Sequence, residues 1–389
     1  MPDSLKSRTI KGTVWSSLER FSVQGIQFIV MILMARVLTP ADYGMIGMIT
    51  IFLAVSQSLI DSGFSQALIR KQNRSDIDNS TVFFFNVGVG IFLYGILFVC
   101  APLISDFYSE PKLTSITRVI GLSLVFNSLV VVQRALLTIN LDFKTQAKAS
   151  LIAALISGII GISMAYGGYG VWAIVFQQII NLSIVTILLW IYSKWKPIAA
   201  YSWASFKELF SFGSKLLAAG LIDTIYKNIY LIVIGKIFKA SELGYYTRAH
   251  QFSDFASSNI TGIFQRVSYP VLCTIQDNDA KLADVYRRIL KTSAFVVFPL
   301  MMGLAALSKP VILAFLTEKW SFSATLLIPL CFSSMWYPIH SINLNLLQVK
   351  GRSDLFLRLE IMKKIIGVTI LCITIPFGLL TMCWGAVVN

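Results

Sequence analysis

Two polar stripes interrupt apolar stretches of the sequence, 200 positions apart. In the first, Thr50, Gln57 and Asp61 fall within about 40° of one another on a helical wheel. The same spacing in the second stripe places His250, Ser257 and Thr261 on one face, and Asp254 joins them there. Polar groups inside an apolar helix are costly, so they usually face a protein interior or a water-filled cavity. We interpret both stripes as candidate cavity walls.

The acidic and histidine residues of these stripes are candidates for ion coupling or gating: Asp61, His250 and Asp254. His250 and Asp254 are four residues apart, close enough to interact on one helix face. A histidine beside a carboxylate can change its protonation near neutral pH. The alternative is a structural hydrogen bond to a neighbouring helix, and the sequence leaves both interpretations open.

A second set of polar side chains could recognise an anion. Asp223 precedes Lys227 by one helical turn, which is the favourable order for an ion pair. Arginine and lysine in a wet cavity would attract phosphate, whereas paired charges would only join helices. The candidate cavity residues are Arg20, Gln24, Gln27, Lys215, Asp223, Lys227 and His340. For His340, we expect a satisfied buried side chain more than a ligand.

The composition places these residues in a membrane protein. Hydrophobic residues make up 56% of the 389 positions, charged residues make up 13%, and the mean hydropathy is +0.72. A soluble domain carries about 25% charged residues. Apolar runs long enough to cross a bilayer separate the charges. The sequence therefore predicts an all-α polytopic membrane protein.

The net charge of +14 follows from the same architecture. With the N-terminus inside, about two thirds of the lysines and arginines fall in inner loops, as the positive-inside rule expects. We therefore predict a cytoplasmic N-terminus in a bacterial cytoplasmic membrane and no nucleic-acid partner. The five cysteines have no C-x-x-C spacing, and no metal motif, Walker loop or activated nucleophile occurs. We predict no catalytic residue, metal or cofactor.

The apolar runs predict the order of the spans. The expected segments are 11–37, 43–69, 81–104, 113–138, 148–166, 171–193, 211–237, 243–272, 289–308, 322–347 and 360–380, with another beginning near Trp384. We expect a six-helix lobe at 1–193, a cytoplasmic linker at 194–210 and a second lobe at 211–389.

An internal repeat relates the two lobes. The stretch "ILMARVLTPADYG" (Ile32 to Gly44) matches "IVIGKIFKASELG" (Ile232 to Gly244) in residue character, unless two helix ends resemble each other by chance. Parallel repeats of this kind form transporters with a binding site between the halves. Pro40 suits the first turn of a helix, and Thr39 or Ser241 could cap one. The second lobe is incomplete by this pattern, so we expect a truncated chain.

Four segments resemble a known family. They are "LTPADYG", "DSGFSQALIRK" (Asp61 to Lys71), "TRAHQFSDFASSNITGIFQRVSYPVL" (Thr247 to Leu272) and "QVKGRSDLFLRLEIMKK" (Gln348 to Lys364). These segments are similar to the Wzx-type polysaccharide flippases, in the colanic-acid-exporter-like branch of the polysaccharide transporter family. The superfamily also contains multidrug/cation antiporters and the peptidoglycan lipid flippase. The resemblance covers essentially the whole chain.

The resemblance implies two six-helix lobes in a V and transport by alternating access. The implied cargo is an oligosaccharide repeat unit on undecaprenyl pyrophosphate, moved to the outer leaflet for surface polysaccharide synthesis. Membrane lipids are implied partners, and a polysaccharide polymerase and chain-length machinery are candidate partners. A cation-coupled drug or metabolite antiporter is the alternative. A membrane-embedded polymerase agrees less well with the sequence, because such an enzyme requires a large outer loop that this sequence lacks.

Overall fold

The computed structural model describes residues 5–388, with side chains from residue 21 onward except 263, 265–267, 269, 270 and 353. Helices joined by short turns make up this range, and no strand occurs within it. The all-α prediction is confirmed.

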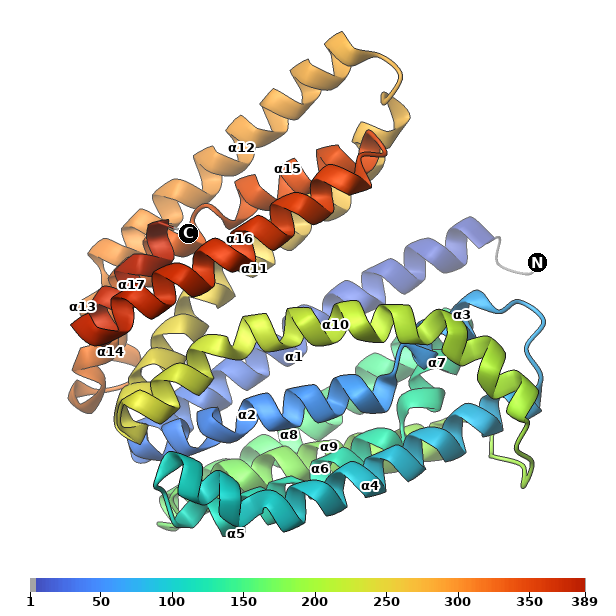
Figure 1. Cartoon of the computed structure of the whole chain (residues 1–389), viewed down its shortest axis with the longest axis horizontal. Coiled ribbons are helices and arrows are strands. Elements are labelled where there is room, and N and C mark those ends of the chain that lie inside the picture. The colour runs from blue at the N-terminus through green and yellow to red at the C-terminus, as the bar shows by residue number, and fades with distance from the viewer. Residues whose placement is uncertain (1–4, 389) are drawn as a thin grey trace. The chain divides into compact units, whose positions relative to one another are not determined.

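The chain divides into two compact units, Met1–Ala240 and Ser241–Asn389. The helices of unit 1 are α1 (Leu5–Val37), α2 (Pro40–Asp61), α3 (Phe64–Arg70), α4 (Asp76–Tyr108), α5 (Lys112–Ile120), α6 (Leu122–Ser128), α7 (Val131–Ile139), α8 (Phe143–Tyr166), α9 (Val171–Tyr192) and α10 (Trp203–Ile237). Those that follow are α11 (Ala240–Thr274), α12 (Asp279–Ala306), α13 (Ser308–Phe315), α14 (Ser321–Ser334), α15 (Tyr337–Val349), α16 (Ser353–Thr374) and α17 (Leu379–Val388), with 3₁₀ turns η1 (Glu318–Trp320) and η2 (Ile375–Phe377). Figure 1 shows their order along the chain.

Eight segments of the described chain are long and apolar enough to cross a membrane. They are Pro40–Arg70, Asp76–Tyr108, Lys112–Ile139, Phe143–Tyr166, Val171–Tyr192, Trp203–Ile237, Asp279–Ala306 and Glu318–Val349. The other predicted spans correspond to α1, α11 and α16. The apolar part of α1 is the shorter segment Phe21–Val37, while α11 and α16 are long helices that carry several charged residues.

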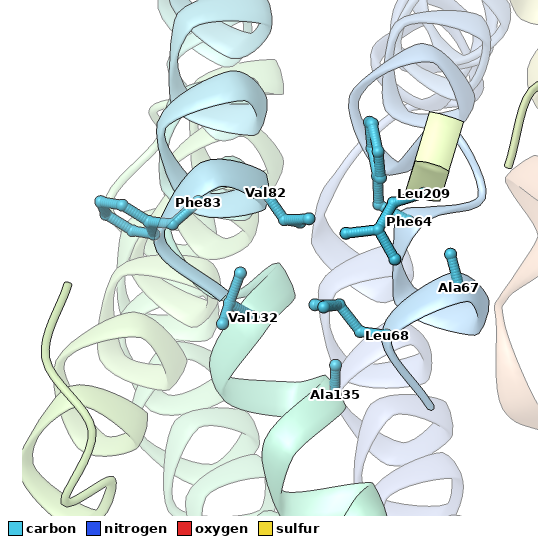
Figure 2. Packing of buried hydrophobic residues seen from close by; sticks show 8 residues of the cluster. All are labelled: Phe64, Ala67, Leu68, Val82, Phe83, Val132, Ala135 and Leu209. Carbon is cyan, nitrogen blue, oxygen red and sulfur yellow. The ribbon is translucent and has the colours of Figure 1, made fainter. Parts of the chain in front are cut away.

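In unit 1, α1 packs along α8, α8 packs along α9, and α10 packs along α2 (Figure 1). A buried apolar cluster joins α3, α4, α7 and α10 near the loop between α3 and α4 (Figure 2). Its members are Phe64, Ala67, Leu68, Val82, Phe83, Val132, Ala135 and Leu209. We call this region the α3–α4 end of unit 1. By the predicted topology it is the cytoplasmic end.

The turn between α1 and α2 is capped as the sequence predicts. Thr39 accepts a hydrogen bond from the Asp42 N–H, Asp42 accepts one from the Thr39 N–H, and Pro40 starts the helix. The equivalent turn differs, because α11 begins at Ala240. Ser241 therefore lies inside the helix, and its predicted capping role is wrong.

Helix α10 begins eight residues before the predicted span at Ser211. Ser202 caps it by accepting a hydrogen bond from the Ser205 N–H. Its first turns are aromatic, with stacked rings of Trp203, Phe206 and Phe210. The predicted linker 194–210 thus contains the start of a helix, and the non-helical segment is 193–202.

In the second unit, α14 packs against α12, α13 and α17, and α15 packs against α12 and α16. Helix α11 is hydrogen-bonded to α14: Ser253 donates to the Leu330 carbonyl, and Ser257 donates to the Ser334 carbonyl at 2.7 Å. Hydroxyls that donate across a helix pair join apolar helices without a hydrophobic driving force.

Candidate functional site

Helix α2 closely approaches other backbone at both of its ends: the first residue of α11 at its start, and α10 at the turn that follows its last residue. A Cβ on Gly44 would lie 1.7 Å from the Ala240 carbonyl oxygen, and one on Gly213 would lie 2.5 Å from the Ser62 carbonyl oxygen. Only glycine permits such an approach, because any side chain would overlap the opposite backbone. Between these points, the hydroxyls of Ser58 and Thr224 are 3.1 Å apart.

Asp61 lies at the end of α2, where the chain turns sharply into α3. Ser62 and Gly63 both adopt left-handed backbone angles, with φ of 46° and 69°. The Ser65 hydroxyl donates to the Asp61 carboxylate. The turn therefore places Asp61 next to the Gly63–Gly213 contact with α10.

The predicted ion pair on α10 is confirmed. Lys227 Nζ lies 2.7 Å from Asp223 Oδ2, and both side chains are exposed, at 70% and 44%. Lys215 is also exposed and lies two residues beyond Gly213. Four of the predicted site residues therefore lie on the packed helices α2 and α10, and two of them, Asp223 and Lys227, are in contact.

The α1 residues are placed differently. Gln24 is half-buried, and its Oε1 has no hydrogen-bond partner among the described residues. Gln27 is exposed. The Arg20 side chain lies outside the described residues. Helix α1 packs mainly on α8, so these positions follow another helix pair.

The stripe on α11 separates into two groups. His250 and Asp254 are exposed, and the described part of the molecule shows no ion pair between them. Ser257 and Thr261 are buried at 2% and 0%, and Thr261 donates to the Ser257 carbonyl. Interpreting these two hydroxyls as cavity walls was wrong, because helix packing already satisfies them.

His340 has a partner that the sequence reading did not identify. Its Nε2 lies 3.1 Å from Glu360 Oε1, which joins α15 to α16. The histidine therefore has a partner, as predicted, but its side chain is half-buried rather than buried. Glu360 itself was a usable signal, because an acid at the start of a predicted span needs a partner.

The arrangement can hold charge inside an apolar span. Lys215, Asp223 and Lys227 lie on one helix whose composition is that of a membrane-spanning segment. Exposed lysines there are point charges that suit a phosphate-bearing ligand. Among residues 21–388 with described side chains, no cluster of His, Cys, Asp and Glu could hold a metal ion.

The sequence matches a family described as "Polysaccharide biosynthesis protein" over residues 33–325. This chain belongs to that family. The predicted resemblance to polysaccharide transporters is confirmed, and the chain is a multi-pass membrane transporter of polysaccharide biosynthesis.

Relatives of this polysaccharide biosynthesis protein align over most of its length. The teichuronic acid biosynthesis protein TuaB of Bacillus subtilis is 27% identical over 355 residues, which is 90% of this chain and 73% of that protein. The lipopolysaccharide biosynthesis protein WzxC of Escherichia coli is 24% identical over 362 residues, covering 92% and 74%. Both relatives function in the synthesis of a polysaccharide, as their names state.

Solved structures share the fold of this family member. The lipid II flippase MurJ in an inward closed conformation aligns with a TM-score of 0.78 at 16% identity, over 96% of this chain and 84% of that one. An inward-facing multidrug resistance MATE transporter aligns with a TM-score of 0.71 at 13% identity, covering 93% and 90%. At these identities the likeness concerns the fold alone.

The family member also contains a charged network that sequence reading missed. Lys71 Nζ lies 3.0 Å from Asp78 Oδ1 and 2.9 Å from Glu208 Oε2, so it joins the α3–α4 loop to α10. Burial lowers the pKa of Lys71, but its bonds to Glu208 and Asp78 outweigh this and raise the pKa above its ordinary value. The capping motif of Ser75 and Asp78 was the available signal.

Thiol labelling tests which of these residues reach water. In a variant without the five native cysteines, we expect a membrane-impermeant maleimide to label Lys227→Cys but not Ile225→Cys. Both side chains are exposed, but they lie on opposite sides of α10, and only the charged one should face water. Equal labelling of the two would contradict a polar cavity along α10.

Proposed function

We propose that this protein is a lipid-linked oligosaccharide flippase of the bacterial cytoplasmic membrane. Its cargo is an oligosaccharide repeat unit on undecaprenyl pyrophosphate, and the N-terminus is cytoplasmic. The observation that carries this proposal is a cationic face on α10, a helix with the composition of a membrane span, in a polysaccharide biosynthesis protein. Placing charged side chains in lipid costs free energy, whereas in a water-filled chamber the same side chains can bind a phosphorylated headgroup.

Alternating access requires two halves, and helix boundaries support the proposed repeat. Helices α1 and α10 end at Val37 and Ile237, while α2 and α11 begin at Pro40 and Ala240. The same offset of 200 residues separates both pairs. On this proposal, the lobes correspond to 1–193 and 211–389, and α10 is the first helix of the second lobe.

The α2–α10 contact suits such a cycle. At one end, the backbone at Gly63 lies against Gly213 of α10, and in the middle the hydroxyls of Ser58 and Thr224 form a hydrogen bond. Opening one end therefore breaks few directional interactions. The ion coupling roles of Asp61, His250 and Asp254 are part of this proposal, with Asp61 at the turn beside the Gly63–Gly213 contact.

Export of surface polysaccharide tests the cargo. In a host strain lacking the endogenous transporter, we expect Lys215→Ala with Lys227→Ala to lower export about tenfold. Losing a charge-assisted hydrogen bond costs about 1.5–3 kcal/mol, and about 1.4 kcal/mol corresponds to a tenfold change. Lys112→Ala changes an exposed lysine at the first position of α5; it is the matched control and should leave export unchanged.

The alternative function gives a different result. An antiporter would confer drug-dependent efflux and leave polysaccharide export at the level of the deletion strain. Export that is unaffected by the paired lysine substitutions would contradict the headgroup role of α10.

A further inference from the structure

The second unit contains a pair of titratable side chains that the proposed function does not use. His340 of α15 and Glu360 of α16 are in contact, with 3.1 Å between Nε2 and Oε1. His340 lies nine positions before the end of the spanning segment Glu318–Val349, which is about 14 Å along the helix axis. Titratable groups at such a depth cost free energy, so a pair of them inside a membrane usually has a function.

The contact between the two helices depends on the charge of the histidine. The two side chains are 30% and 24% exposed, so they are partly shielded from solvent while protons can still reach them. Histidine ordinarily changes its charge between about pH 5 and about pH 8. Once the imidazole has bound a proton, its hydrogen bond to the carboxylate of Glu360 is charge-assisted and about twice as strong. One proton therefore strengthens the link between α15 and α16.

Glu360 also has alternative partners on its own helix. Lys363 and Lys364 follow it by three and four residues, the spacings at which side chains of one helix are neighbours. The Lys363 side chain is half-buried, and none of the ion pairs among the described residues includes it. When His340 is neutral, a lysine is the stronger partner for the carboxylate. When His340 is protonated, the imidazolium competes with the lysines.

The other acids of the neighbouring helices are already paired. Helix α15 packs on α12 and α16. Besides Glu360, the acids of these helices have basic partners: Asp279 with Lys350, Asp284 with Arg288 and Asp354 with Arg352. The bases outside these pairs are Lys281, Arg287, Lys291, Arg358, Lys363 and Lys364, and Tyr286 donates to Asn343 of α15. The positive charge beside a single carboxylate favours a proton over a metal ion, which needs several oxygen ligands.

We propose that His340 and Glu360 form a proton-binding site that switches the α15–α16 pair between two arrangements. With the proton on the imidazole, Nε2–H donates to Glu360 and the two helices stay joined. After the proton leaves to water, Glu360 pairs with the lysines of α16 and the helices separate. The site lies on other helices than the ion-coupling candidates above. A proton gradient would bias the transport cycle through this switch, and only that last step rests on the proposed function.

Spin labels on the full chain test the switch. The protein is reconstituted in nanodiscs of phosphatidylethanolamine and phosphatidylglycerol, with the five native cysteines replaced by alanine. Tyr337→Cys and Ile365→Cys place labels at exposed positions of α15 and α16. As the pH rises from about 5 to about 8, we expect the labels to move apart by about 1–2 Å, the size of helix shifts in switching proteins. The only ligand in this experiment is the proton.

Substitutions identify the groups that respond to the proton. His340→Gln and Glu360→Gln should each remove the pH response, because neither variant can form the imidazolium–carboxylate pair. Glu360→Asp should retain it, since the carboxylate charge is kept. Lys363→Gln with Lys364→Gln should reduce the separation at about pH 8, because Glu360 then has no basic partner within one turn of α16.

Asp284→Asn is the matched control, because it neutralises an acid of α12 that pairs with Arg288 in an exposed position. It should respond to pH like the wild type. A wild-type separation that does not change with pH would overturn the inference. The same holds if the response is lost in His250→Gln but kept in His340→Gln, since the chain contains only these two histidines.

The proposed function is tested separately by export in the deletion strain. A protein that shows the pH response but does not restore export keeps the switch, and the flippase assignment fails. If export is restored by a protein whose helices show no pH response, only the proton-binding site fails.

Discussion

Replacing Gly44 with alanine is expected to destabilise unit 1 by about 3 kcal/mol or more, because overpacking a close contact costs about 1–3 kcal/mol and here the obstacle is backbone. The new Cβ would lie 1.7 Å from the carbonyl oxygen of Ala240. No rotamer change can relieve the overlap, so α2 and the start of α11 at Ala240 must separate. Thermal unfolding of the detergent-solubilised protein would show the loss as a lower midpoint.

Gly95→Ala is the control for this prediction. It lies in α4 and meets no atom within 4 Å, so alanine there should be neutral or slightly stabilising through its higher helix propensity. If the Gly44 and Gly95 variants unfold at the same temperature, the close approach of α2 to the α10–α11 turn is not present.

Replacing Lys71 with alanine is expected to lower the free energy of unfolding by about 2–3 kcal/mol. Removing one partner of a buried ion pair costs about 3–5 kcal/mol, and the hydrogen bonds that Asp78 still accepts from other donors reduce this loss. The Asp78 side chain is only 4% exposed, and it keeps its bond from the Ser75 N–H after the change. Its negative charge would nevertheless remain buried without the lysine. The aromatic start of α10 would also lose its link through Glu208.

Arg288→Ala is the comparison for Lys71. Arg288 pairs with Asp284 at 3.5 Å, and their side chains are 80% and 70% exposed. Solvent screens such a pair, so its loss should change stability by less than about 0.5 kcal/mol. An equal effect of the two substitutions would contradict the role of the Lys71 network.

The pH dependence of the network's contribution to stability follows from the direction of the pKa shift of Lys71. Because the pKa of folded Lys71 is raised, its contribution is fully present below the ordinary lysine pKa and is lost only as the pH rises through the higher folded value. The Lys71→Ala effect should therefore be constant near neutral pH. It should shrink in strongly alkaline solution.

Local features of the sequence were sufficient to predict a helix cap and an ion pair. The Thr39–Asp42 cap and Pro40 follow from residue types within one turn, and the structure places them as predicted. The ion pair of Asp223 with Lys227 follows from a spacing of four on one helix. Such interactions depend on chain positions that are fixed before any tertiary contact forms.

Other features depend on which helices meet. Lys71 pairs with Glu208, which lies 137 residues away in sequence, and His340 pairs with Glu360, which lies 20 residues away. The sequence contains these residues, but only the helix packing shows that they meet. The stripe of Ser257 and Thr261 has the same periodicity whether it lines water or packs on a neighbour, and the contact with α14 decides between these. The start of α10 depended in the same way on aromatic packing around Phe206.

The sequence by itself determined that this protein is an all-α membrane transporter, because hydropathy, charge placement and helical periodicity are properties of the chain alone. Only the tertiary structure decided which polar residues remain exposed and which form contacts between helices. It also decided that Gly63 and Gly213 lie backbone to backbone where α2 meets α10. The physical reason is that the free energy of placing a polar side chain in a membrane depends on the partner with which it forms a hydrogen bond or ion pair. That partner comes from another part of the chain.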